Sequence, residues 1–139
     1  MKTIPEGLFD NCTEVTDFSS TFKGCTALQV IPEGLFDKCT EVRYFGSIFY
    51  QCKGLTSIPQ GLFDKCTEVT SFGSAFLECL NLTGESPYTV IQVDGVDTKI
   101  HLYERENYPE HFTAPTDYGM CFSYCTNLTD YGSIPSGWK

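Results

Sequence analysis

Apolar and polar positions along the first 84 residues follow a pattern that recurs every 27 residues. The three copies align without a gap and begin at Ile4, Ile31 and Ile58. Each copy has two similar halves, in which an aromatic residue, a cysteine and a Val or Leu follow one another at intervals of three residues, as in Phe9, Cys12 and Val15. A repeat of this length predicts a solenoid, because so small a unit buries its apolar face only by stacking on its neighbours.

The residue types within each copy favour short elements. The phrase Ile-Pro-x-Gly-Leu-Phe suits one turn of α or 3₁₀ helix, because proline is tolerated where no amide partner is needed. The first cysteine of each copy is followed by β-branched and aromatic residues, such as residues 40–45, which suit a short strand. Strands of successive copies would lie in parallel, roughly 4.8 Å apart. We therefore predict an α/β fold of short parallel strands and short helical turns.

Cysteine marks the phase of the repeat, with spacings that alternate between 13 and 14 residues. Equivalent cysteines one strand spacing apart lie within reach of a disulfide, so distance alone does not exclude bonding. Side chains in register point the same way, however, and three stacked cysteines cannot all pair. Because free Cys is among the most often buried residue types, we predict a structural ladder of unbonded thiols. Its members are Cys12, Cys25, Cys39, Cys52, Cys66, Cys79 and Cys125.

Residues 85–111 do not follow the repeat. Two β-rich runs flank Asp94 and Gly95, a pair typical of a tight hairpin turn, so we predict a β-hairpin insertion in this segment. Residues 112–139 hold a degenerate further copy and a cap. We expect one continuous domain in which the three repeats of residues 1–84 are followed by the hairpin insertion and then by the C-terminal repeat.

The phrase Val-Thr-x-Phe-x-x-x-Phe-x-x-Cys-x-x-Leu runs from Val69 to Leu82, and with a following Ile-Pro from Val15 to Pro32. It resembles the BspA-like leucine-rich repeats of bacterial surface proteins. The resemblance implies a leucine-rich-repeat-like right-handed solenoid and an adhesive role, with no catalytic residues. The chain departs from the family in having a longer unit of 27 residues with two nearly equivalent halves.

Composition narrows the function classes. The chain has 139 residues, of which 41% are hydrophobic and 19% charged, so it is expected to fold. It has no apolar run long enough to span a membrane, and its first residues lack the apolar stretch of an export signal. The net charge of −9 repels phosphate backbones and anionic lipid, so we expect no nucleic-acid partner.

Differences among the three copies concentrate in the second half of the unit. The middle copy carries a mixture of aromatic and cationic groups there, which is typical of recognition surfaces. Neutral variation at solvent-facing positions is the alternative explanation. The candidate binding residues are Arg43, Tyr44, Tyr50, Gln51 and Lys53.

Two other groups of residues resemble reactive or metal-binding sites. His101 and His111 occur near three glutamates, at positions 104, 106 and 110, but nothing in a hairpin followed by a loop fixes a catalytic geometry. Acidic residues also recur in phase and either form a solvated face or offer oxygens to calcium: Glu6, Asp10 and Glu14 correspond to Glu33, Asp37 and Glu41, and to Gln60, Asp64 and Glu68. The three aspartates could instead bond local backbone amides. We favour an unreactive group of histidines and glutamates and a solvated acidic face. We therefore predict no catalytic residue, metal or cofactor.

These observations predict a non-enzymatic interaction and adhesion module at the cell surface or in a secreted protein, with a protein or glycan on a host or neighbouring cell as its partner. Two alternatives are a carbohydrate-binding accessory domain of a carbohydrate-active enzyme and a structural spacer. The exposed first copy also allows end-to-end association, because unpaired strand edges template pairing. The oligomeric state is left open.

Overall fold

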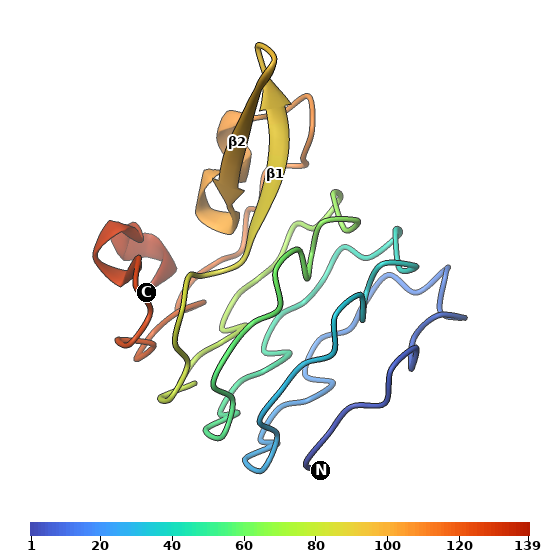
Figure 1. Ribbon diagram of the computed structural model, residues 1–139, viewed down its shortest axis with the longest axis vertical. Helices are drawn as coiled ribbons and strands as arrows, with labels where there is room; N and C mark the ends of the chain where they lie inside the picture. The colour runs from blue at the N-terminus through green and yellow to red at the C-terminus, as the bar shows by residue number, and fades with distance from the viewer.

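The computed structural model describes residues 1–139, and its main feature is a stack of chain layers that lie side by side (Figure 1). Layers 1 to 4 are residues 4–30, 31–57, 58–84 and 112–129. The same backbone hydrogen bond recurs between neighbouring layers: the amides of Phe18, Phe45 and Phe72 donate to the carbonyls of Tyr44, Ser71 and Asp117 at 2.9, 2.9 and 2.8 Å. The 27-residue period therefore corresponds to the step from one layer to the next.

The secondary structure predicted for the repeats is wrong. Neighbouring layers meet at single isolated parallel bridges, and the chain has no α-helix and no parallel strand. The one sheet is an antiparallel pair formed by β1 (Tyr88–Val93) and β2 (Val96–His101). The helical elements are three 3₁₀ segments, η1 (Leu102–Asn107), η2 (Tyr131–Ser133) and η3 (Ser136–Trp138). The α/β class and the leucine-rich-repeat-like solenoid of strands and helical turns are therefore both corrected.

Left-handed residues explain why the expected elements do not form. The helical turn after each Ile-Pro is interrupted by Gly7, Gly34 and Gly61, whose φ angles are 71, 71 and 75°. The expected strands are reduced to single bridge residues such as Tyr44, and the chain does not extend them past Ser20, Ser47 and Ser74, whose φ angles are 62, 56 and 55°. Neither a right-handed helix nor a strand accommodates a positive φ. The chain consequently runs through linked turns, although its residue types favour strands.

Phenylalanine rings and aliphatic side chains form one continuous core through the layers. Rings at equivalent positions stack nearly parallel, with centroid separations between 5.4 and 6.1 Å. The three columns are Phe9–Phe36–Phe63, Phe18–Phe45–Phe72 and Phe22–Phe49–Phe76–Phe122. Burying a side chain of this size stabilises a fold by about 1.5–3 kcal/mol, so the ring columns add to the backbone hydrogen bonds that join the layers.

The predicted hairpin is present and stands above the turns of layer 3 (Figure 1). Its turn residues Asp94 and Gly95 have φ angles of 51 and 79°, as a two-residue hairpin turn requires. The hairpin and η1 come where the first half of another repeat would otherwise follow layer 3. Arg105 of η1 is buried against layer 3 and donates to the carbonyl oxygens of Phe63 and Cys66. The insertion therefore covers half of the last complete layer.

The C-terminal segment covers the other half of the stack. The indole of Trp138 stacks on Tyr118 with 4.7 Å between ring centroids. The backbone carbonyl of Trp138 accepts a hydrogen bond of 2.8 Å from the amide of Phe122. Trp138 is 6% exposed.

None of the helical segments has the length and apolar character needed to cross a membrane.

All eight cysteines are free. Six are buried, whereas Cys12 and Cys25, both in layer 1, are half-buried. Between layers the thiols donate to backbone carbonyls, as Cys52 does to Phe22 at 3.1 Å and Cys79 to Phe49 at 3.1 Å. Burial raises the pKa of Cys52 to about 12. The ladder cysteines of layers 2 to 4 thus act as hydrogen-bond donors between layers.

Candidate functional site

The most extended concavity of the molecule is a polar groove of about 570 Å³ that crosses all four layers. Its volume falls in the range of sites that hold small ligands. Twelve residues line it, of which seven carry an aliphatic hydroxyl and three are glycines; Tyr44 is its one aromatic residue. The hydroxyl-bearing residues are Ser19, Ser20, Ser47, Thr70, Ser71, Ser74 and Thr116.

Small residues hollow the groove. Gly46, Gly73 and Gly119 occupy equivalent positions on its floor in layers 2, 3 and 4. A Cβ atom added to Gly73 would lie 2.7 Å from the carboxylate of Asp117, which is shorter than any ordinary contact. Because glycine has no side chain, position 73 leaves room for the Asp117 carboxylate in the groove.

A column of three serines runs along the groove. Ser20, Ser47 and Ser74 each donate their backbone amide to the next layer at 2.9 Å. Their hydroxyls make no hydrogen bond with the protein, and each residue has a left-handed backbone, a conformation that costs a non-glycine residue free energy. Three identical hydroxyls are thus presented unpaired, one per layer.

Tyr44 and Asp117 supply the other chemistry of the groove. Tyr44 is 44% exposed. Asp117 accepts a hydrogen bond of 2.9 Å from the Ser71 hydroxyl. No Lys, Arg or His side chain lines the groove. The surface therefore offers hydroxyl donors and acceptors, one ring face and one carboxylate.

Only Tyr44 of the five predicted binding residues lines the groove. Arg43 precedes it in the chain and is exposed, as is Lys53. Tyr50 and Gln51 lie at the next turn and are half-buried. Tyr50 lies beneath the Lys23 ammonium, at 5.1 Å, and Gln51 donates to Glu78 at 2.9 Å.

The serine column was missed because invariant positions were interpreted as packing positions. Ser20, Ser47 and Ser74 recur at the same place in the three copies. A small polar residue repeated inside an aromatic motif, with no packing reason for its hydroxyl, is the sequence signal that identifies them.

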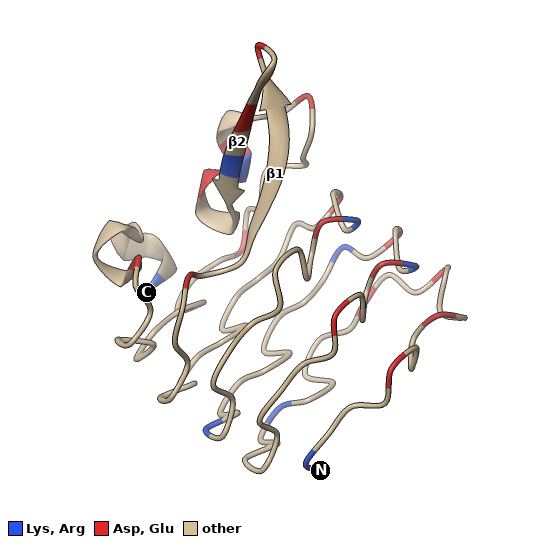
Figure 2. Ribbon diagram, viewed as in Figure 1, with Lys and Arg blue, Asp and Glu red and all other residues tan.

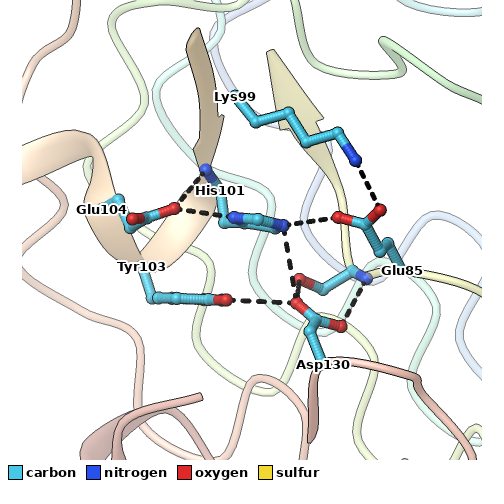
Figure 3. A network of polar contacts seen from close by, with 7 residues as sticks. Glu85, Lys99, His101, Tyr103, Glu104 and Asp130 are labelled. Carbon is cyan, nitrogen blue, oxygen red and sulfur yellow. Dashed lines mark hydrogen bonds and ion pairs between the residues drawn. The ribbon is translucent and has the colours of Figure 1, made fainter. Parts of the chain in front are cut away.

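The predicted cluster of histidines and glutamates is divided between two places. His101 lies between Glu104, 2.7 Å from its Nδ1 atom, and Glu85, 2.8 Å from its Nε2 atom (Figure 3). His111 and Glu110 instead line a separate pocket of about 270 Å³ near the hairpin turn. The two histidines therefore do not share a site.

Asp130 anchors the polar network around His101. It accepts the amide and hydroxyl of Ser86 at 2.9 and 2.6 Å and the hydroxyl of Tyr103 at 3.1 Å. Burial alone would raise the pKa of Asp130, but the hydrogen bonds from Ser86 and Tyr103 lower it below the usual value. Burial and the nearby Asp130 raise the pKa of Tyr103.

The network joins the hairpin to the C-terminal segment. Lys99 pairs with Glu85 at 2.6 Å, while Ser86 is fully buried and its hydroxyl is committed to Asp130. No side chain of the network is left as an activated nucleophile within reach of a base. Its evident effect is to hold the insertion against the chain that follows layer 4.

Acidic residues recur at the turns on the hairpin side of successive layers (Figure 2). No group of three or more His, Cys, Asp or Glu side chains is arranged to hold a metal ion.

No family model matches the chain, and no curated protein matches it. The resemblance to BspA-like repeats consequently stays a prediction, while the leucine-rich solenoid that it implied is corrected by the fold.

Proposed function

We propose that this protein is a non-enzymatic interaction module that holds a protein or glycan partner in the groove across its layers. One observation carries the proposal: unpartnered hydroxyls of Ser20, Ser47 and Ser74 recur at the same groove position in three successive layers. Serine at a left-handed position retains the backbone strain that glycine would relieve. A hydrogen bond from the hydroxyl to a ligand would explain why serine occupies these positions, whereas packing does not explain it.

The lining of the groove favours binding over catalysis. Its ionisable side chains are Asp117 and Tyr44. General acid–base chemistry needs a pair of groups positioned on a reacting atom, and nucleophilic chemistry needs a nucleophile beside its base. The only carboxylate of the groove instead accepts a hydrogen bond from Ser71.

We place the module at the cell surface or in a secreted protein as part of the same proposal. Unpaired cysteines are vulnerable in an oxidising compartment, where the thiolate is the reactive form. Burial raises the pKa of Cys39 to about 11 and that of Cys66 to about 12, which suppresses their thiolates. The buried ladder is thus compatible with a location outside the cell.

Binding is tested on a glycan array and a displayed peptide library, with a hydrolase assay on the same protein sample. Ser47→Trp fills the groove, and Met120→Trp is the matched control because Met120 is also left-handed but does not line the groove. We expect binding by the wild type and by Met120→Trp, loss of binding in a folded Ser47→Trp, and no release of product. Equal binding by the two variants, or turnover of a bound glycan, would overturn the proposal.

A further inference from the structure

We infer that the groove takes a neutral oligosaccharide whose chain lies across the layers. This inference rests on the proposed function and deepens it by naming the chemistry of the partner. It combines four features of the same surface: its charge, its paired backbone, its free hydroxyls and its single aromatic ring.

Charge excludes the anionic ligands. No cationic side chain lines the groove, and Asp117 contributes a carboxylate to it. The whole chain carries a net charge of −9. Nucleic acids, phosphorylated peptides and acidic polysaccharides would each meet a repulsive potential here without a compensating ion pair.

The backbone disfavours an extended peptide. Peptides that bind along a protein edge do so mainly through main-chain hydrogen bonds to unpaired groups. Along the groove the amides of Ser20, Ser47 and Ser74 already donate to the carbonyls of Gly46, Gly73 and Gly119, each at 2.9 Å. An open edge is left only at the two ends of the stack, in layer 1 and layer 4, and in layer 4 Trp138 accepts the amide of Phe122.

The free side chains match a sugar. A serine hydroxyl both donates and accepts, and so does each hydroxyl of a saccharide. Ser20, Ser47 and Ser74 repeat with the layers, at a separation of roughly 4.8 Å for neighbouring backbones in this geometry. A polymer of identical polar units meets the same hydroxyl in each of layers 1 to 3.

Tyr44 and Asp117 complete the site. The exposed ring of Tyr44 presents an apolar face with a polar tip, the combination suited to the C–H face of a pyranose ring and its hydroxyls. Asp117 is held by Ser71, and the carboxylate keeps lone pairs for two neighbouring sugar hydroxyls. Acceptance by a charged carboxylate gives the stronger of the expected hydrogen bonds.

The test is isothermal titration of the intact protein with three kinds of probe. These are neutral hexasaccharides built from glucose, N-acetylglucosamine, mannose or galactose, a heparin hexasaccharide, and hexalysine. We expect at least one neutral hexasaccharide to bind and neither charged probe to do so. Tyr44→Ala should weaken binding by about ten-fold or more, and the Ser47→Ala, Ser74→Ala double variant by about ten-fold. Tyr124→Ala, which removes a ring that is 60% exposed outside the groove, should leave affinity unchanged.

The outcomes separate this inference from the proposed function. Binding of hexalysine or of a library peptide that is lost in Tyr44→Ala, with no neutral saccharide bound, overturns the oligosaccharide and leaves the groove as a binding site. Saccharide binding that Tyr44→Ala and the double serine variant leave intact places the ligand elsewhere and overturns both. Absence of binding by every saccharide and peptide also overturns both.

Discussion

Arg105 donates to the backbone carbonyl of Cys66 at 2.8 Å, in the place where a cysteine thiol donates between the preceding layers. One layer earlier, the thiol of Cys66 donates to the carbonyls of Cys39 and Phe36. The guanidinium takes the equivalent pair of carbonyls, those of Cys66 and Phe63. The insertion therefore ends the column of Cys12, Cys39 and Cys66 by supplying a different donor to the same acceptors, whereas the other column continues to Cys125, whose thiol donates to Phe76.

Replacement of Arg105 by alanine should destabilise the fold by about 3–5 kcal/mol, because it leaves two buried carbonyls unpaired and opens a cavity. Arg105 is fully buried and lies 4.5 Å from the centre of the Phe112 ring. Arg105→Lys should lose roughly half as much, since an ammonium lacks the planar fork that reaches both carbonyls. Urea unfolding followed by Trp138 fluorescence measures these differences.

Lys99→Ala is the matched control for Arg105, since Lys99 is an exposed cation of the same insertion. Its surface ion pair with Glu85 is expected to contribute little to stability, because solvent screens an exposed pair. If the Arg105→Ala variant were as stable as Lys99→Ala, the hydrogen bonds of the guanidinium to layer 3 would not stabilise the fold.

The thiols should fall into two reactivity classes. Cys12 and Cys25 are half-buried, whereas the other six cysteines are buried. Burial raises the pKa of Cys125, for example, to about 12, so its thiolate is scarce at pH 8. We expect Ellman's reagent to modify two thiols in the native protein and the remainder only after addition of guanidinium. Cys12→Ser should remove one of the two; uniform reaction of all eight would contradict the layered burial.

Acid should weaken the attachment of the hairpin through Asp130 and Glu85. Hydrogen bonds from Lys99 and His101 lower the pKa of Glu85, and those to Asp130 lower its pKa below 3.8. A carboxyl with a lowered folded-state pKa contributes stability that is present above its unfolded pKa and is lost as pH falls through the folded value. We expect the free energy of unfolding to fall steadily from about pH 5 downwards.

Asp130→Asn isolates this effect. It should cost about 1–2 kcal/mol at pH 7, because charge-assisted hydrogen bonds become neutral ones, and should flatten the acid limb of the stability profile. Glu106→Gln, which alters an exposed carboxylate outside the network, should reproduce the wild-type profile. Parallel profiles for wild type and Asp130→Asn would exclude Asp130 as a source of the acid sensitivity.

Gly54→Ala should strain the contact between layers 1 and 2. An added Cβ would lie 2.5 Å from the carbonyl oxygen of Thr26 and 3.1 Å from that of Leu28, both of them backbone atoms. Overpacking of this kind costs about 1–3 kcal/mol. Gly119→Ala meets no atom within 4 Å and is the control, with little expected change in stability. Thermal or urea unfolding of the pair checks the spacing of the layers, and equal stabilities would contradict it.

The sequence predicted the parts of the fold that depend on local chemistry. The pair Asp94-Gly95 identifies a hairpin because both residues tolerate positive φ. The period of the repeat follows from positions that packing holds constant. Element type was not predictable in the same way, since the β-branched and aromatic residues at 40–45 have strand propensity but form turns and a single bridge at Tyr44, with the left-handed Ser47 two residues after this segment.

The sequence also could not predict which distant residue takes the place of a thiol in the last complete layer. Arg105 lies 39 residues from Cys66, and nothing local indicates that a guanidinium replaces a thiol. In the groove, Tyr44 was identified from its variation among the copies, whereas Ser47 was overlooked because it does not vary. Variation among the copies identifies only some candidate binding residues. A serine that is the same in every copy is recognised only when the structure shows that its hydroxyl has no hydrogen-bond partner.

The most direct test of the central claim is a ¹⁵N-resolved NMR titration with the tightest binder from the saccharide and peptide arrays. The account predicts that amide shifts concentrate at the groove residues of successive layers, at Ser20, Ser47, Ser74 and Gly119, and leave the hairpin turn unchanged. Shifts confined to the pocket around Asp94, Tyr108 and His111, with the groove amides unmoved, would contradict it.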